Sequence, residues 1–210
     1  MARVKCLLFD LGGVLLSIDH ARAKKKLSHL LNIPIEQLDK IYAEDQSMLD
    51  YEKGLLERSD FLAWGKEKFS TKFSEREFIE AWNLVLGSFD WEMFELLERL
   101  KSRYELYLLS NTNCLHLERI GQMLDAADRK GHYLDLFNQH FYSFEMGHRK
   151  PEAQVYTKVL QQIDCMAQDV LFIDDSQSNI EAADTLNFQT LLWKPKQHNA
   201  KWLSQWLSQK

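Results

Sequence analysis

The sequence predicts an α/β protein, a Rossmann-like, doubly wound parallel sheet into which an all-helical cap is inserted. The apolar run at residues 4–9 is typical of a buried parallel strand. Three later segments, at residues 105–110, 140–144 and 170–174, repeat this pattern. Helical stretches separate them, as expected for right-handed crossovers. Residues 17–87 are helical in pattern and too many for a single crossover, which indicates an insertion.

The first strand runs directly into Asp10, Gly12 and Gly13. In open α/β sheets, ligands bind beyond the carboxyl ends of the strands, so Asp10 is predicted to lie where chemistry is carried out. The two glycines allow a sharp turn and a close approach of the backbone to a ligand or metal. The alternative is that Asp10 only caps a loop that the glycines turn.

The inserted segment, residues 17–87, contains no stretch that is typical of a strand. Ser59 is expected to be the N-cap of one of its helices. Ser74 and Glu77 have the spacing of a capping box and predict the start of another. The expected helices cover residues 21–31, 35–42, 61–69 and 78–86.

Strands and helices alternate again from Asp90 onward. The expected strands cover residues 106–109, a segment around 141, 170–173 and 189–193. The expected helices cover residues 91–101, 113–127, 133–137, 152–163 and 179–186. Trp202, Leu203, Trp206 and Leu207 form an apolar stripe that predicts a helix packed on the core. The predicted domains are therefore an α/β core of residues 1–16 and 88–210 and a helical cap of residues 17–87.

The composition excludes several classes of protein. The net charge is −5 and no long basic block is present, so we expect no nucleic-acid partner. No apolar stretch is long enough to span a bilayer, and no signal peptide is recognisable, so we expect no membrane association. Cys6, Cys114 and Cys165 are odd in number and lack CxxC spacing. We therefore expect neither a disulfide nor a zinc site, and a cytoplasmic location.

Chemically useful side chains follow the predicted strands in order. Asp10 is the carboxylate at the tip of the first strand and the candidate nucleophile. Ser110 and the backbone of Asn111 are suited to hydrogen-bonding phosphate oxygens, and either residue could instead cap the next helix. Lys150 supplies a positive charge, although taken alone it could be an exposed loop lysine.

Asp174 and Asp175 end the strand at residues 170–173 and offer the hard oxygen ligands that Mg²⁺ prefers. A magnesium ion there would offset the repulsion between Asp10 and a phosphate dianion. One aspartate of the pair could bind the metal directly and the other through water. The alternative is that the pair caps the helix that follows.

The ordered set of a carboxylate, a hydroxyl with an amide, a lysine and a carboxylate pair resembles the haloacid dehalogenase-like (HAD) hydrolase superfamily. The resemblance covers almost the whole chain. It implies an aspartyl-phosphate intermediate on Asp10, a magnesium site that includes Asp10 and the carbonyl of Gly12, and a helical cap of the C1 type found in subfamily I.

Gly12 departs from the commoner pattern of this superfamily, in which an aspartate at that position acts as general acid and base. Glycine cannot transfer a proton. Asp19 is the candidate substitute, although it could simply cap the helix that follows. The segments around Asp10 and Asp19 and around Asp174 resemble the bacterial glucose-1-phosphatase-like branch, which also has glycine at position 12.

The expected function is a magnesium-dependent phosphatase acting on a small phosphorylated metabolite. A sugar phosphate is favoured by the resemblance, and a nucleotide or flavin mononucleotide is an alternative. Two other readings stay open: a phospholigand-binding or regulatory protein that lost turnover with Gly12, and a haloacid dehalogenase. The expected assembly is a monomer or a homodimer.

Overall fold

The computed structural model describes residues 3–69 and 73–209. Its centre is a parallel five-stranded sheet in the order β5-β4-β1-β6-β7. The predicted strands are confirmed with small shifts at their ends. They are β1 (Cys6–Phe9), β4 (Glu105–Ser110), β5 (Gln139–Tyr142), β6 (Val170–Asp174) and β7 (Gln189–Leu192). Because β1 lies in the middle, Asp10 emerges at the centre of the carboxyl edge of the sheet.

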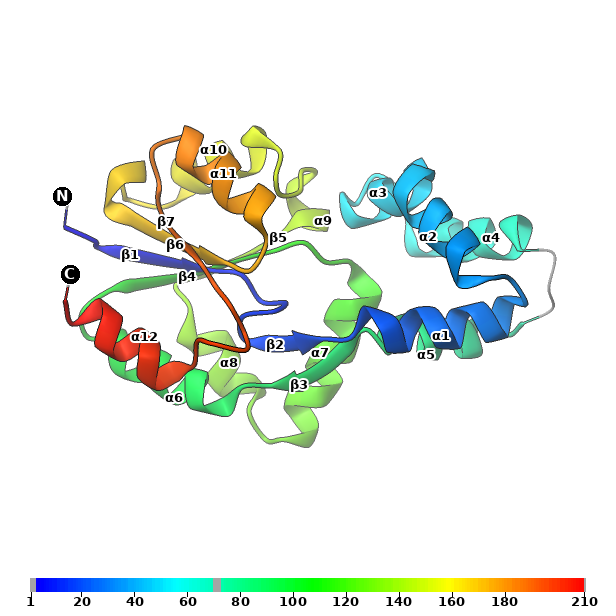
Figure 1. Ribbon diagram of the computed structural model, residues 1–210, viewed down its shortest axis with the longest axis horizontal. Coiled ribbons are helices and arrows are strands. Elements are labelled where there is room, and N and C mark those ends of the chain that lie inside the picture. The colour runs from blue at the N-terminus through cyan, green and yellow to red at the C-terminus, as the bar shows by residue number, and fades with distance from the viewer. Residues whose placement is uncertain (1–2, 70–72, 210) are drawn as a thin grey trace.

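Helices cover both faces of this sheet, as a doubly wound fold requires (Figure 1). Leu7 and Phe9 face the first layer and Cys6 and Leu8 the second, because successive side chains of a strand point to opposite faces. The first layer contains α6 (Trp91–Leu100), α7 (Cys114–Ala126), α8 (Lys130–Leu136) and α12 (Ala200–Leu207). The second contains α9 (Ser143–Met146), α10 (Ala153–Gln162), the 3₁₀ turn η1 (Ala167–Asp169) and α11 (Gln177–Thr185).

Five of the helices between β1 and β4 extend together to one side of the sheet (Figure 1). They are α1 (His20–Leu31), α2 (Ile35–Glu44), α3 (Gln46–Glu52), α4 (Arg58–Lys68) and α5 (Glu75–Asn83). We call this group the helical insertion. An apolar cluster of its own holds it together, with Phe61 and Phe78 almost fully buried and Leu115 of α7 joining from the sheet side.

The expectation that residues 17–87 contain no strand is wrong. Two short strands, β2 (Leu16–Ile18) and β3 (Leu86–Phe89), pair antiparallel where the chain enters and leaves the helical insertion. Each is too short to show an alternating pattern, and its pairing partner lies far away in the sequence. The predicted domain boundaries at residues 17 and 87 fall inside these strands. The predicted domain ranges also include residues 1–2, 70–72 and 210, which lie outside the described residues.

Details of the helix ends also differ from expectation. The capping box of Ser74 and Glu77 is confirmed. Ser59 is not an N-cap, because α4 already begins at Arg58 after an N-cap at Glu57. Helix α3 was not predicted. It begins at Gln46 because the carboxylate of Asp45 accepts a hydrogen bond from the backbone N–H of Ser47.

The cysteine expectation is corrected as well. The structure joins Cys6 of β1 to Cys165, 159 residues later, in a disulfide, while Cys114 is a free thiol. The two partners meet because the loop before η1 packs on the face of the sheet to which the side chain of Cys6 points. The spacing of the cysteines in the sequence does not predict such a contact. None of the helices in residues 3–69 and 73–209 combines the length and apolarity that crossing a bilayer requires.

Candidate active site

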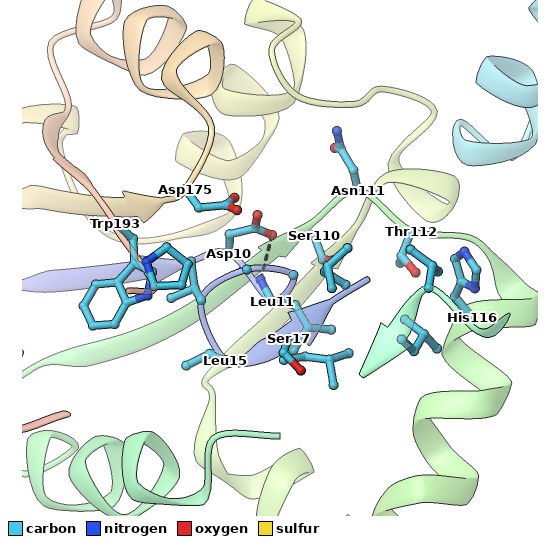
Figure 2. Close-up of a pocket in the computed structure, with 18 of the residues that line it drawn as sticks. Asp10, Leu11, Leu15, Ser17, Ser110, Asn111, Thr112, His116, Asp175 and Trp193 are labelled. Carbon is cyan, nitrogen blue, oxygen red and sulfur yellow. Dashed lines mark hydrogen bonds between the residues drawn. The ribbon is translucent and has the colours of Figure 1, made fainter. Parts of the chain in front are cut away.

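The carboxyl edge of the sheet opens into a pocket of about 790 Å³ beneath the helical insertion. Asp10, Gly12, Ser110, Asn111, Lys150 and Asp175, all predicted site residues, line it. Figure 2 shows Asp10, Asp175 and Ser110 around one space, with Trp193 at one end and His116 at the other. The fold therefore brings together side chains that come from four different strands or the loops after them.

Lys150 lies at the centre of the charges in this pocket. Its side chain is 1% exposed, and its ammonium is 2.8 Å from Oδ1 of Asp10 and 2.7 Å from Oδ2 of Asp174. Burial by itself would lower the pKa of Lys150, but the attraction of Asp10 and Asp174 outweighs it and raises that pKa. Lys150 is therefore charged and fixed between two carboxylates, and the alternative of an exposed loop lysine is wrong.

Asn111 holds the backbone of Lys150 in place. Its side-chain amide donates to the carbonyl of Lys150 at 2.9 Å and accepts from the N–H of Lys150 at 2.8 Å. The side chain of Asn111 is thus occupied, which leaves the backbone as the part that could face a substrate. The capping alternative for Ser110 and Asn111 is not observed, because Asn113 is the N-cap of α7.

The two late aspartates have different surroundings. Asp174 is fully buried, and its carboxylate accepts hydrogen bonds from Lys150, from Nδ2 of Asn179 and from the N–H of Ser176. Asp175 is exposed, and its carboxylate lies against Gly13. Helix α11 begins at Gln177 with no side-chain cap, so neither aspartate serves only as its cap.

Asp10 is buried, and its carboxylate has few partners. Its Oδ1 accepts hydrogen bonds from the N–H of Leu11 at 2.6 Å and from Lys150, while its other oxygen lies nearer Asp175 in the view of Figure 2. Burial raises the pKa of Asp10 to about 7 against the attraction of Lys150, and repulsion from Asp174 and Asp175 adds to this effect. Burial and the neighbouring Asp174 also raise the pKa of Asp175.

These carboxylates fit a divalent cation. One oxygen from each of Asp10, Asp174 and Asp175 lies within 4.8 Å of the others. Three carboxylates face a single lysine, so the site holds an excess of negative charge, and repulsion among the carboxylates adds to burial in raising the pKa of Asp10. A Mg²⁺ ion bound by these oxygens would supply the missing positive charge.

Gly12 and Gly13 shape the loop after β1. Gly13 has a φ of +75°, and a Cβ added there would lie 2.0 Å from Oδ2 of Asp175, so only glycine fits. A Cβ on Gly12 would approach Cγ1 of Ile18 at 3.1 Å. The space next to Gly12 is therefore taken by a side chain from β2.

The carboxylate of Asp19 caps α1. It accepts a hydrogen bond from the N–H of Arg22 at 2.9 Å, and the lining of the pocket passes from Ile18 to His20 without it. The capping alternative for Asp19 is thus confirmed, while its acid–base role stays a prediction.

Sequence reasoning missed many residues of the pocket, and among the charged or ionisable ones are His20, Glu52, His116 and Arg149. Glu52 on α3 lies 2.9 Å from Nε of Arg149, so an ion pair joins the helical insertion to the loop before Lys150. Burial raises the pKa of Glu52 although Arg149 opposes this effect. No spacing in the sequence signals these residues, because they come from separate elements. The position of Arg149 beside Lys150 was the one available hint.

Comparison with known proteins agrees with this geometry. A family model for haloacid dehalogenase-like hydrolases matches residues 4–186. D-ribitol-5-phosphate phosphatase of Bacteroides thetaiotaomicron is 26% identical over 188 residues, covering 89% of this chain and 90% of that protein. The sesquiterpene phosphatase astK of Aspergillus oryzae is 27% identical over 190 residues, covering 87% of this chain and 86% of that protein.

A solved structure extends the comparison. The HAD family enzyme BT-2542 of Bacteroides thetaiotaomicron, in complex with magnesium and inorganic phosphate, superposes with a TM-score of 0.81. It is 28% identical, and the match covers 93% of this chain and 96% of that one.

The geometry around Gly13 predicts that Gly13→Ala damages the site. The added methyl group requires a left-handed backbone that costs about 1–2 kcal/mol of unfolding free energy, and it displaces the carboxylate of Asp175. We expect a lower melting temperature and weaker Mg²⁺ binding, measured by thermal denaturation and calorimetric titration. Gly131→Ala in α8 is the control, because nothing lies within 4 Å of the added Cβ. Equal Mg²⁺ affinity in both variants would contradict the contact between Gly13 and Asp175.

Proposed function

This chain belongs to the haloacid dehalogenase-like hydrolase family, and on that premise we propose that it is a magnesium-dependent phosphatase of small hydroxylated phosphomonoesters. The observation that carries the proposal is the group of Asp10, Asp174 and Asp175 around the buried ammonium of Lys150. It provides a nucleophile, a set of oxygen ligands for a metal and a fixed positive charge in one pocket.

Asp10 is the nucleophile in this proposal. A carboxylate oxygen of Asp10 attacks phosphorus, the bond from phosphorus to the leaving-group oxygen breaks, that oxygen takes a proton from water, and an aspartyl phosphate forms. Water then attacks that intermediate, releases inorganic phosphate and restores Asp10. Oxygens of Asp10, Asp174 and Asp175, together with the carbonyl of Gly12, would hold Mg²⁺, which would supply charge stabilisation for the phosphate oxygens.

The other residues hold the reacting groups. Lys150 keeps the carboxylate of Asp10 oriented through its 2.8 Å contact and stabilises the negative charge of the phosphate. Ser110 and the backbone N–H of Asn111 lie at the end of β4 and line the pocket, where they bind phosphate oxygens. The helical insertion acts as a C1-type cap that shields the site from water.

The substrate class is inferred from the far part of the pocket. The named substrates of the two similar phosphatases differ, since one is a phosphorylated polyol and the other carries a sesquiterpene group. In this chain His20, Glu52, His116 and Arg149 bring polar groups to the pocket beyond the carboxylates. Such a lining suits a leaving group that carries hydroxyls, and it favours a sugar or polyol phosphate over an apolar ester.

A binding protein without turnover is the second candidate, because Gly12 provides no proton donor for the leaving group. Haloacid dehalogenation is less favoured, because attack on carbon needs no cation and the carboxylate group here is suited to one. The first experiment below separates these readings from the phosphatase.

The principal prediction concerns Asp10. Asp10→Asn removes the nucleophile, so release of phosphate from a panel of sugar phosphates, nucleotides and flavin mononucleotide with Mg²⁺ should fall at least about a thousandfold. The metal-free variant should melt no lower than wild type at pH 8. Ionising Asp10 destabilises the fold as pH rises from 3.8 toward 7, and asparagine never ionises.

The matched control is Asp164→Asn, on an exposed turn outside the pocket, which should keep wild-type rates. Wild-type rates in Asp10→Asn would refute the mechanism. No release by wild type from any member of the panel, with ligands still raising its melting temperature, would support the binding protein instead.

Mg²⁺ binding should depend on pH because of Asp10. The pKa of Asp10 is about 7 without metal, so below pH 7 the cation must displace a proton. Mg²⁺ affinity, measured by calorimetry in buffers of different ionisation enthalpy, should fall about fivefold between pH 7 and pH 6, and it should change much less between pH 8 and pH 9. An affinity that is constant from pH 6 to pH 8 would show that Asp10 is not a ligand.

The role of Asp19 is tested by Asp19→Asn. Asparagine caps a helix as well as aspartate does but cannot donate a proton, so the variant separates the two roles. Because the carboxylate already accepts the N–H of Arg22, we expect a phosphatase rate within about twofold of wild type and an unchanged pH–rate profile. A large loss of rate with an unchanged melting temperature would instead establish Asp19 as the acid–base group.

A further inference from the structure

The pocket extends past the phosphate-binding residues to a histidine at the boundary with the helical insertion. Asp10, Ser110, Thr112 and His116 follow one another across the view in Figure 2. His116 lies in the first turn of α7 and is partly exposed in the lining of the pocket. A leaving group that extends from a phosphate bound at Asp10 toward the helical insertion would therefore meet His116.

The imidazole of His116 is held from two sides by α5. Its Nδ1 lies 2.9 Å from Oδ1 of Asn83, and its ring stacks on Trp82 with centroids 5.6 Å apart and planes at 9°. An amide oxygen can only accept a hydrogen bond, so Nδ1 of His116 carries the proton. In this tautomer Nε2 has a lone pair and no proton.

The charge state is consistent with this tautomer. Burial lowers the pKa of His116 to about 3, and the charge of nearby His20 contributes in the same direction. The ring is therefore neutral at physiological pH. Several side-chain nitrogen and oxygen atoms in the described residues are buried without a hydrogen-bond partner. Nε2 of His116 does not belong to this group, as expected for an atom at the edge of the pocket.

We propose that Nε2 of His116 accepts a hydrogen bond from a hydroxyl group of the leaving group and thereby selects hydroxylated phosphomonoesters. Asn83 is a positioning residue that fixes the orientation of the imidazole. An apolar ester would desolvate Nε2 without providing a donor, which penalises its binding. This inference rests on the proposed phosphatase function and adds a residue that discriminates between substrates.

The inference also gives the helical insertion a part in specificity. Asn83 and Trp82 belong to α5, whereas His116 belongs to α7 of the α/β core. The acceptor is therefore oriented only where these two helices pack together. Selection of a hydroxylated leaving group would then depend on the packing of the insertion against the core.

The test compares ribitol 5-phosphate with pentyl phosphate, which has the same number of carbons and no hydroxyl groups. His116→Phe keeps an aromatic ring that can stack on Trp82 but removes both nitrogens. With Mg²⁺ at pH 8, its kcat/KM for ribitol 5-phosphate should fall about tenfold or more, mainly through KM. Its kcat/KM for pentyl phosphate should not fall and should rise by the desolvation penalty that Nε2 no longer imposes. His29→Phe, at an exposed position of α1, is the matched control and should change neither value.

Two substitutions at Asn83 test the same acceptor without altering α7. Asn83→Leu removes the oxygen that holds Nδ1 and should raise KM for ribitol 5-phosphate alone, whereas Asn83→Asp keeps an accepting oxygen and should restore the preference at pH 8. A purely structural role for Asn83 would affect both substrates equally.

The outcomes separate the two proposals. If wild type releases phosphate from both esters, and the His116 and Asn83 variants lose neither or both in equal measure, the role of His116 is refuted and the phosphatase stands. If wild type hydrolyses neither these esters nor any other member of the phosphomonoester panel, the proposed function fails and the role of His116 fails with it.

Discussion

The site depends on one buried ammonium group. Lys150 is 1% exposed and touches Asp10 and Asp174, two carboxylates that would otherwise lie unpaired in the interior. Removing the ammonium would be strongly destabilising, because it would leave both carboxylates without a positive partner in the interior. Asn111 holds the backbone of Lys150 and Asn179 holds Asp174, so a residue after β4 and a residue of α11 position the network. The same contacts that stabilise the edge of the sheet also orient Asp10, the proposed nucleophile.

This network still lacks positive charge. Asp10, Asp174 and Asp175 outnumber Lys150, and burial raises the pKa of Asp10 to about 7. A cation with two positive charges would balance the site, and its binding would ionise Asp10. The proposed magnesium affinity and the raised pKa of Asp10 thus both follow from burying more carboxylates than ammonium groups in one place.

The two ends of the pocket differ in the groups that line them. Near Asp10, the lining groups are charged and could act on any phosphate ester. Toward the helical insertion, His116 and Glu52 are joined to Asn83 and Arg149 across the boundary between insertion and core. Substitutions in these pairs, which join the helical insertion to the core, can occur without disturbing the carboxylates. Variation in specificity within a shared mechanism is the expected consequence, and the two similar phosphatases act on differently named substrates.

The sequence by itself determined the five strands of the sheet, the apolar faces of most helices and the order of Asp10, Ser110, Lys150 and the aspartate pair, because period and position along the chain encode them. Only the tertiary structure decided which contacts form between segments that are distant in the sequence and which role each side chain takes. It paired β2 with β3, joined Cys6 to Cys165, turned His116 toward Asn83 and engaged Asp19 as a cap rather than leaving it in the pocket lining. Local pattern records the propensity of each segment, whereas a contact between remote residues exists only after the chain has folded.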